Sequence, residues 1–126
     1  MAFEFLRSEN SAAPIEKEIP AANGTTYEHG CLLNLVNGAA AATTGKPEFV
    51  YAGKTVVAKT GDQLAVRVVF PEDEYMTMLS ASGSSLKAGN KVTTTGTLAT
   101  ATTASGVFQL LTDGGASGSK VVGRFI

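Results

Sequence analysis

Residues 64–70 read Leu-Ala-Val-Arg-Val-Val-Phe, and this is the clearest strand pattern in the chain. Alternate side chains of an extended strand share one face, while Arg67 points to the opposite face. The pattern therefore predicts a buried row made of Leu64, Val66, Val68 and Phe70. A turn signal, Gly61-Asp62, precedes the stretch, and Pro71 ends it.

Similar signals continue on both sides of this strand. Asn37-Gly38 is the strongest short-range hairpin signal, and it separates residues 27–36 from residues 39–44. The four alanines at 39–42 could also begin a short helix, but the threonines and Gly45 that follow favour a returning strand. Further strand candidates are residues 49–51, 55–58, 107–111 and 121–126, with a flexible loop at 113–119. We expect an all-β body, built as a small barrel or sandwich of short strands.

The first part of the chain has a different character. Residues 1–23 carry apolar side chains, yet Pro14 and Pro20 favour extended backbone and prevent a continuous helix. We expect an extended N-terminal docking arm at 1–23 and a β-rich body at 24–126. An exposed arm of this kind must be covered by a partner. The residues expected to contact that partner are Phe3, Phe5, Leu6, Ile15 and Ile19.

Composition excludes several classes of protein. The 126 residues fit one domain, and 44% of them are hydrophobic, which argues against general disorder. A net charge of −1 provides no positive field for nucleic acid. No apolar run is long enough to span a membrane. No signal-peptide pattern follows Met1, so we expect synthesis in the cytoplasm.

Catalytic and metal-binding patterns are weak. Cys31 is the one cysteine and lies in an apolar run, which favours a small buried side chain over a nucleophile. His29 and Cys31 could meet if they lay on one strand, but the sequence marks no third group to orient them. A single histidine and a single cysteine also argue against a metal site. We expect no enzyme activity and no cofactor.

Two polar segments are candidates for surface contacts. Glu72, Asp73 and Glu74 follow Pro71, and we expect an exposed acidic turn that leads into a strand. Residues 113–119 resemble a phosphate-binding loop in composition only, because Ser119 separates Gly118 from Lys120. We therefore interpret them as a loop, with either segment facing solvent or a neighbouring subunit.

These features together resemble a family. The chain resembles tailed-phage head decoration proteins, also called capsid cement proteins. The resemblance rests on a short apolar N-terminal arm, a body rich in Gly, Ala and Thr, the segment Leu86-Lys87-Ala88-Gly89-Asn90-Lys91-Val92 and the late strand Gly106-Val107-Phe108-Gln109-Leu110. The resemblance implies a non-enzymatic bacteriophage structural protein on the capsid exterior of the virion. It implies attachment to the major capsid protein through the arm, and a homotrimer as the favoured oligomer.

Two alternatives remain open from the sequence. A tail or head-fibre component would use the same arm for self-polymerisation, and it would form high oligomers in isolation. A small ligand-binding β barrel, for example for carbohydrate, is less favoured because the chain has three tyrosines and no tryptophan to stack on sugars.

Overall fold

The alternating stretch around Val66 forms the strand β8 (Gln63–Val68), which lies in a sheet of five strands. Another part of this sheet, the hairpin of β4 (Leu32–Val36) and β5 (Ala39–Ala42), is explained by a local sequence signal. Asn37 and Gly38 both have positive φ, 51° and 82°, as a two-residue hairpin turn requires. The alanines after this turn form a strand, not a helix, so the hairpin prediction is confirmed.

The computed structural model describes residues 2–9 and 13–126, and the described part contains strands and loops without a helix. The fold class is all-β, and the arrangement is a compact sandwich-like one and not a closed barrel. The strands are β1 (Glu4–Ser8), β2 (Glu16–Pro20), β3 (Thr26–Tyr27), β4 (Leu32–Val36), β5 (Ala39–Ala42), β6 (Phe49–Tyr51), β7 (Val56–Val57), β8 (Gln63–Val68), β9 (Asp73–Met78), β10 (Lys91–Val92), β11 (Phe108–Leu110) and β12 (Lys120–Phe125).

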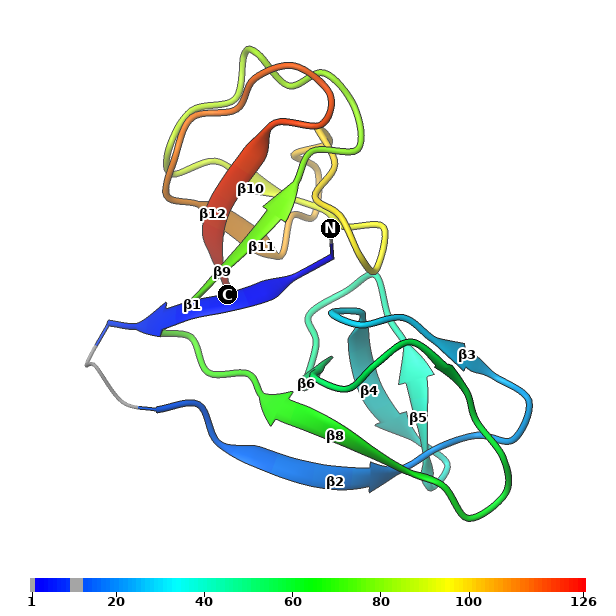
Figure 1. Ribbon diagram of the computed structural model, residues 1–126. Helices are drawn as coiled ribbons and strands as arrows, with labels where there is room; N and C mark the ends of the chain where they lie inside the picture. The colour runs from blue at the N-terminus through cyan, green and yellow to red at the C-terminus, as the bar shows by residue number, and fades with distance from the viewer. Residues whose placement is uncertain (1, 10–12) are drawn as a thin grey trace.

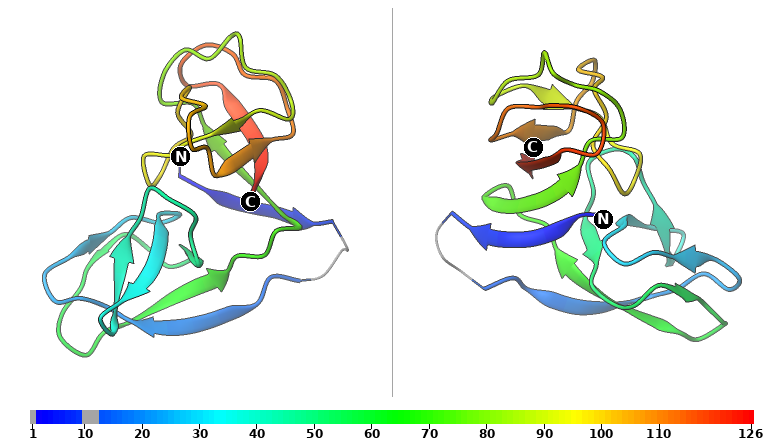
Figure 2. Two further views of the ribbon diagram at one scale, coloured as in Figure 1. Left: turned by 180° about the vertical axis from the view of Figure 1, so that it is seen from behind. Right: turned by 45° about the horizontal axis from the view of Figure 1, so that its top comes forward.

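The strands build two lobes (Figure 1). Sheet A has the order β1-β9-β12-β11-β10, and sheet B has the order β2-β8-β6-β4-β5. Each sheet is antiparallel throughout. A third, two-stranded sheet pairs β3 with β7. In the described residues, consecutive strands β1 and β2 belong to different lobes, and so do β8 and β9, between which the chain passes from sheet B to sheet A (Figure 2).

Two apolar clusters hold the molecule together. The first core lies under sheet A and contains Phe3, Tyr75, Phe108 and Phe125. The second core is enclosed by sheet B and the β3–β7 pair, and it includes Leu64 and Val66, as predicted. Sheet B contributes to both cores, because neighbouring side chains of a strand point to opposite faces. Leu32 belongs to the first core and the adjacent Leu33 to the second. The lobes are therefore packed on each other through sheet B.

Several predicted boundaries require correction. The strand expected over 27–36 is broken between β3 and β4, where Gly30 adopts a positive φ of 82°. A Cβ at Gly30 would lie 2.6 Å from the carbonyl oxygen of Phe3, so the break makes room for the start of the chain. Val68 and Phe70 are only half-buried, because β8 ends at Val68 and the chain leaves the sheet there. The strand predicted at the end of the chain is confirmed as β12, which is central in sheet A.

A hydroxyl group links the two edges of sheet B. Tyr27 Oη donates a hydrogen bond of 2.7 Å to the carbonyl of Ala40 on β5 and accepts one of 2.9 Å from the N–H of Ala22, just beyond β2. Sheet B therefore curls so that its first and last strands approach each other without backbone pairing between them. Tyr27 supplies the connection that a closed barrel would make through its backbone.

Candidate functional site

The N-terminal segment is extended, as predicted, but it is not a separate arm. β1 pairs with β9 at the edge of sheet A, and β2 pairs with β8 at the edge of sheet B. Two ion pairs reinforce the outer strand, Arg7 to Glu74 at 3.1 Å and Arg124 to Glu9 at 2.8 Å. The expected division into a free arm at 1–23 and a body at 24–126 is therefore wrong for the described residues. The segment completes both sheets of its own domain.

Two of the predicted contact residues belong to the interior. Phe3 is 1% exposed, and its ring centroid lies 5.2 Å from that of Phe108 and 5.1 Å from that of Phe125. Ile19 is also 1% exposed and lies in the second core. Their exposure in the isolated protein was predicted wrongly, because the sheet edges that receive them come from distant parts of the chain. Burial in the chain's own cores offsets the entropy lost on ordering the segment.

The other three predicted contact residues lie nearer the surface. Phe5 is half-buried, with its ring 5.7 Å from that of Tyr75. The β1–β9 register shifts between Phe5 and Arg7, and Leu6, at the shift, is 40% exposed. Ile15 is 55% exposed, although its carbonyl accepts a hydrogen bond from Val68 N–H. Leu6 and Ile15 are thus the residues of the predicted set that remain available to a partner.

The acidic run does not form one exposed turn. Asp73 is buried, and its carboxylate accepts a hydrogen bond of 3.2 Å from the backbone N–H of Phe70. Burial raises the pKa of the Asp73 carboxyl, while hydrogen bonds from Phe70 and the Ser8 side chain oppose that rise. Glu74 pairs with Arg7, and Glu72 is half-buried. The three acids separate because β9 begins at Asp73 and alternates their directions.

No hydrogen bond joins the histidine and the cysteine in the described part of the chain. They lie in the connection between β3 and β4 and not on one strand. His29 is exposed, with Nδ1 2.8 Å from the carbonyl oxygen of Gly53. Cys31 is buried, as predicted, and burial raises the pKa of its thiol to about 11, with the Glu28 charge adding to the rise. At neutral pH the thiol is therefore protonated and a poor nucleophile.

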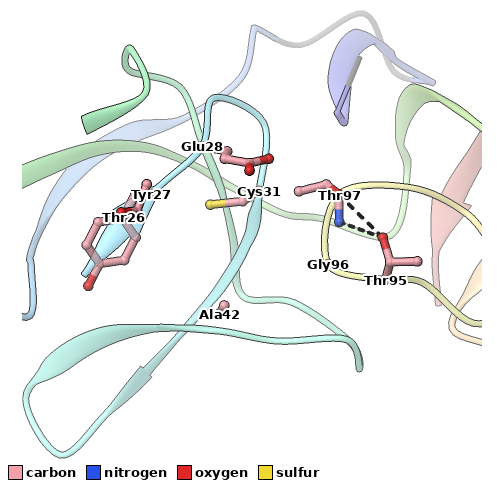
Figure 3. A pocket seen from close by; sticks show the side chains of 8 residues that line it. All are labelled: Thr26, Tyr27, Glu28, Cys31, Ala42, Thr95, Gly96 and Thr97. Atoms are coloured by element: carbon pink, nitrogen blue, oxygen red, sulfur yellow. Dashed lines mark hydrogen bonds between the residues drawn. The ribbon is translucent and has the colours of Figure 1, made fainter. Parts of the chain in front are cut away.

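A pocket of about 320 Å³ opens beside Cys31 (Figure 3). One side is formed by Thr26, Tyr27, Glu28, Cys31 and Ala42, and the other by the loop Thr95–Thr97 of the opposite lobe. No sequence signal marks this pocket, because its two sides lie more than fifty residues apart and consist mainly of common small residues. The pocket combines groups from both lobes.

Within residues 2–9 and 13–126 there is no group of three His, Cys, Asp or Glu side chains that could hold a metal ion. The same residues include no helix long and apolar enough to cross a membrane. Comparison with known proteins identifies no match, either to a protein-family model or to a curated protein.

Proposed function

We propose that this protein is a structural, non-enzymatic component of a phage virion that binds the outer surface of the expanded capsid. It would bridge subunits of the major capsid protein and act as a homotrimer. The sequence resemblance to capsid decoration proteins suggests this class. The observation that carries the proposal is the position of the N-terminal segment, which supplies an edge strand to each sheet and leaves Leu6 and Ile15 exposed.

The proposed contact is the outer edge of β1 together with the exposed side chain of Ile15, just before β2. An edge strand has backbone N–H and C=O groups on one side that lack a strand partner, and a strand from another protein can pair with them. The bulge position of Leu6 adds an apolar anchor next to those groups. Attachment would therefore combine main-chain pairing with burial of two aliphatic side chains.

Preorganisation changes the energetics of such attachment. A free arm of about twenty residues would lose on the order of 20 kcal/mol of conformational entropy on binding, at roughly 1 kcal/mol per residue. In this fold β1 and β2 are ordered before binding, so that cost is already met during folding. A small contact surface can then suffice, especially when a trimer binds through several copies at once.

The stabilising effect would follow from linkage. A protein that binds the expanded lattice, and binds the separated subunits or the precursor less well, shifts the equilibrium towards the expanded lattice. No catalytic step is required. The protein would act by occupancy alone.

Co-sedimentation with expanded phage heads tests the proposal. We expect the intact chain to sediment with heads, and a Leu6→Asp/Ile15→Asp double variant to bind at least about tenfold more weakly, because each charge would enter an apolar contact. Val57→Asp is the matched control, since Val57 is 59% exposed but lies on β7, which pairs with β3 and with neither N-terminal strand. Equal binding by the double variant and the control would refute the assigned surface.

Deleting residues 2–22 is a poor test, because it removes Phe3 and Ile19 from the two cores. The alternative of a tail or fibre component is distinguished by sedimentation velocity of the isolated chain. A capsid-binding protein should remain a monomer or trimer, whereas a polymerising component should form much larger species through the same open edges.

A further inference from the structure

The pocket beside Cys31 is held open by contacts between the two lobes. Leu32 N–H donates a hydrogen bond of 2.8 Å to the carbonyl of Gly96, and Thr94 Oγ1 donates one of 3.1 Å to the carbonyl of Thr44. The loop that carries Thr95 is further fixed by the bond from Thr95 N–H to Leu98 O, 2.9 Å. The cavity is thus preformed, and a ligand would not have to order either side.

The lining has an apolar side and a charged side. Ala42 is exposed and offers an apolar surface, Cys31 adds the 7% of its surface that is exposed, and its thiol carries no charge at neutral pH. Glu28 is the one acidic or basic residue among those that line the pocket, and the hydroxyl-bearing loop with Thr97 lies across from it (Figure 3). The cavity therefore suits a ligand with an aliphatic stem and a positively charged end.

Glu28 has no opposite charge of its own. It takes part in none of the four ion pairs found in the described part of the chain. A divalent metal ion needs more oxygen ligands than one carboxylate and a few hydroxyls provide. An anion would be repelled by the carboxylate. A guanidinium group fits best, because its planar set of N–H donors can bond to a carboxylate and to neighbouring hydroxyl or carbonyl oxygens together.

We propose that this pocket binds the side chain of an arginine presented by a partner protein. The Glu28 carboxylate receives the guanidinium, and the methylene stem lies along Cys31 and Ala42. Since the two sides of the pocket come from different lobes, the bound side chain contacts both. This inference is separate from the proposed capsid attachment, because its test uses the isolated chain and a pocket that contains none of the N-terminal residues.

The test is a titration followed by two-dimensional ¹⁵N–¹H NMR. The probe is the peptide acetyl-Gly-Arg-Gly-amide, and its matched control is acetyl-Gly-citrulline-Gly-amide, which has nearly the same shape but no charge. We expect saturable shifts of the amides of Thr26, Cys31 and Thr97 with the arginine peptide only. Glu28→Gln should weaken binding roughly tenfold or more, as expected for a lost charge-assisted hydrogen bond.

Glu18→Gln is the control variant, because Glu18 is an exposed acid on β2 that does not line the pocket. Its affinity for the arginine peptide should equal that of the unmodified chain. Equal shifts with the arginine and citrulline peptides, no saturable shift, or unchanged affinity in Glu28→Gln would each overturn the proposal. Agmatine serves as a free guanidinium probe. Binding of agmatine without binding of the peptide would indicate a site for a free small cation and would also overturn it.

Discussion

Replacing Phe3 with alanine tests whether the N-terminal strand belongs to the folded domain when no partner is present. The Phe3 ring is enclosed by the first core and makes close ring contacts with Phe108 and Phe125. Truncation of a buried phenylalanine typically costs about 3–5 kcal/mol, from lost transfer free energy and the cavity that remains. That cost is a large part of the roughly 5–15 kcal/mol that stabilises a typical domain.

Urea unfolding of the isolated chain provides the measurement. With a urea dependence of about 2 kcal/mol per molar, the loss corresponds to a midpoint shift of about 2 M. Leu6→Ala is the matched control on the same strand, and because Leu6 is 40% exposed its cost should stay below about 1 kcal/mol. If the two variants unfold at the same urea concentration, Phe3 is not packed in the isolated protein. The reasoning about the N-terminal strand would then be refuted, and the free-arm interpretation would return.

Four further predictions follow from particular contacts. Tyr27→Phe should cost about 1–2 kcal/mol in urea unfolding, because it removes the hydroxyl that bridges the edges of sheet B; an unchanged midpoint would contradict that bridge. Gly123→Ala should lower the free energy of unfolding by about 1–3 kcal/mol or more, because the new Cβ would lie 2.4 Å from the carbonyl oxygen of Gln109. An unchanged Tm in thermal unfolding would show that this clash does not occur. Because the pKa of Asp73 is raised in the folded protein, its contribution to stability is lost as the pH rises above 3.8 through the raised value. Asp73→Asn should therefore flatten that part of the stability–pH curve. An unchanged slope would contradict the raised pKa. The pKa of Cys31 is about 11, against 9.0 for an ordinary thiol, so Cys31 should react with iodoacetamide at pH 8 roughly 100-fold more slowly than in the urea-unfolded chain. Its contribution to stability should be lost as the pH rises from 9 through about 11. Equal reaction rates in the folded and unfolded states would show an accessible thiol.

Local signals predicted much of the fold because they act over a few residues. The Asn37-Gly38 turn needs two positive φ values, and that requirement is readable from the two residue types alone. The period-2 pattern around Val66 likewise identified a strand and the burial of Leu64 and Val66. The burial of Cys31 followed from its apolar neighbours. The acidic run was misread, because the burial of Asp73 depends on where β9 begins and on its contact with Ser8 across the β1–β9 pair.

The candidate sites were less predictable, because they depend on contacts between segments far apart in the chain. An apolar segment looks alike whether it is covered by a partner or by its own domain, so the sequence alone could not distinguish Phe3 and Ile19 from Leu6 and Ile15. The pocket beside Cys31 required the loop Thr95–Thr97 to meet the β3–β4 connection, and neither segment carries a motif.

The amino-acid sequence by itself determined that this protein is an all-β chain with extended N-terminal segments, since strand alternation, turn chemistry and proline geometry are local properties. Only the tertiary structure decided which surfaces those strands cover. The edges of sheets A and B are assembled from residues far apart in the chain, and there Phe3 and Ile19 are buried, where the sequence suggested exposure. Pairing over such distances depends on the whole set of competing contacts, and no short stretch of residues contains that information.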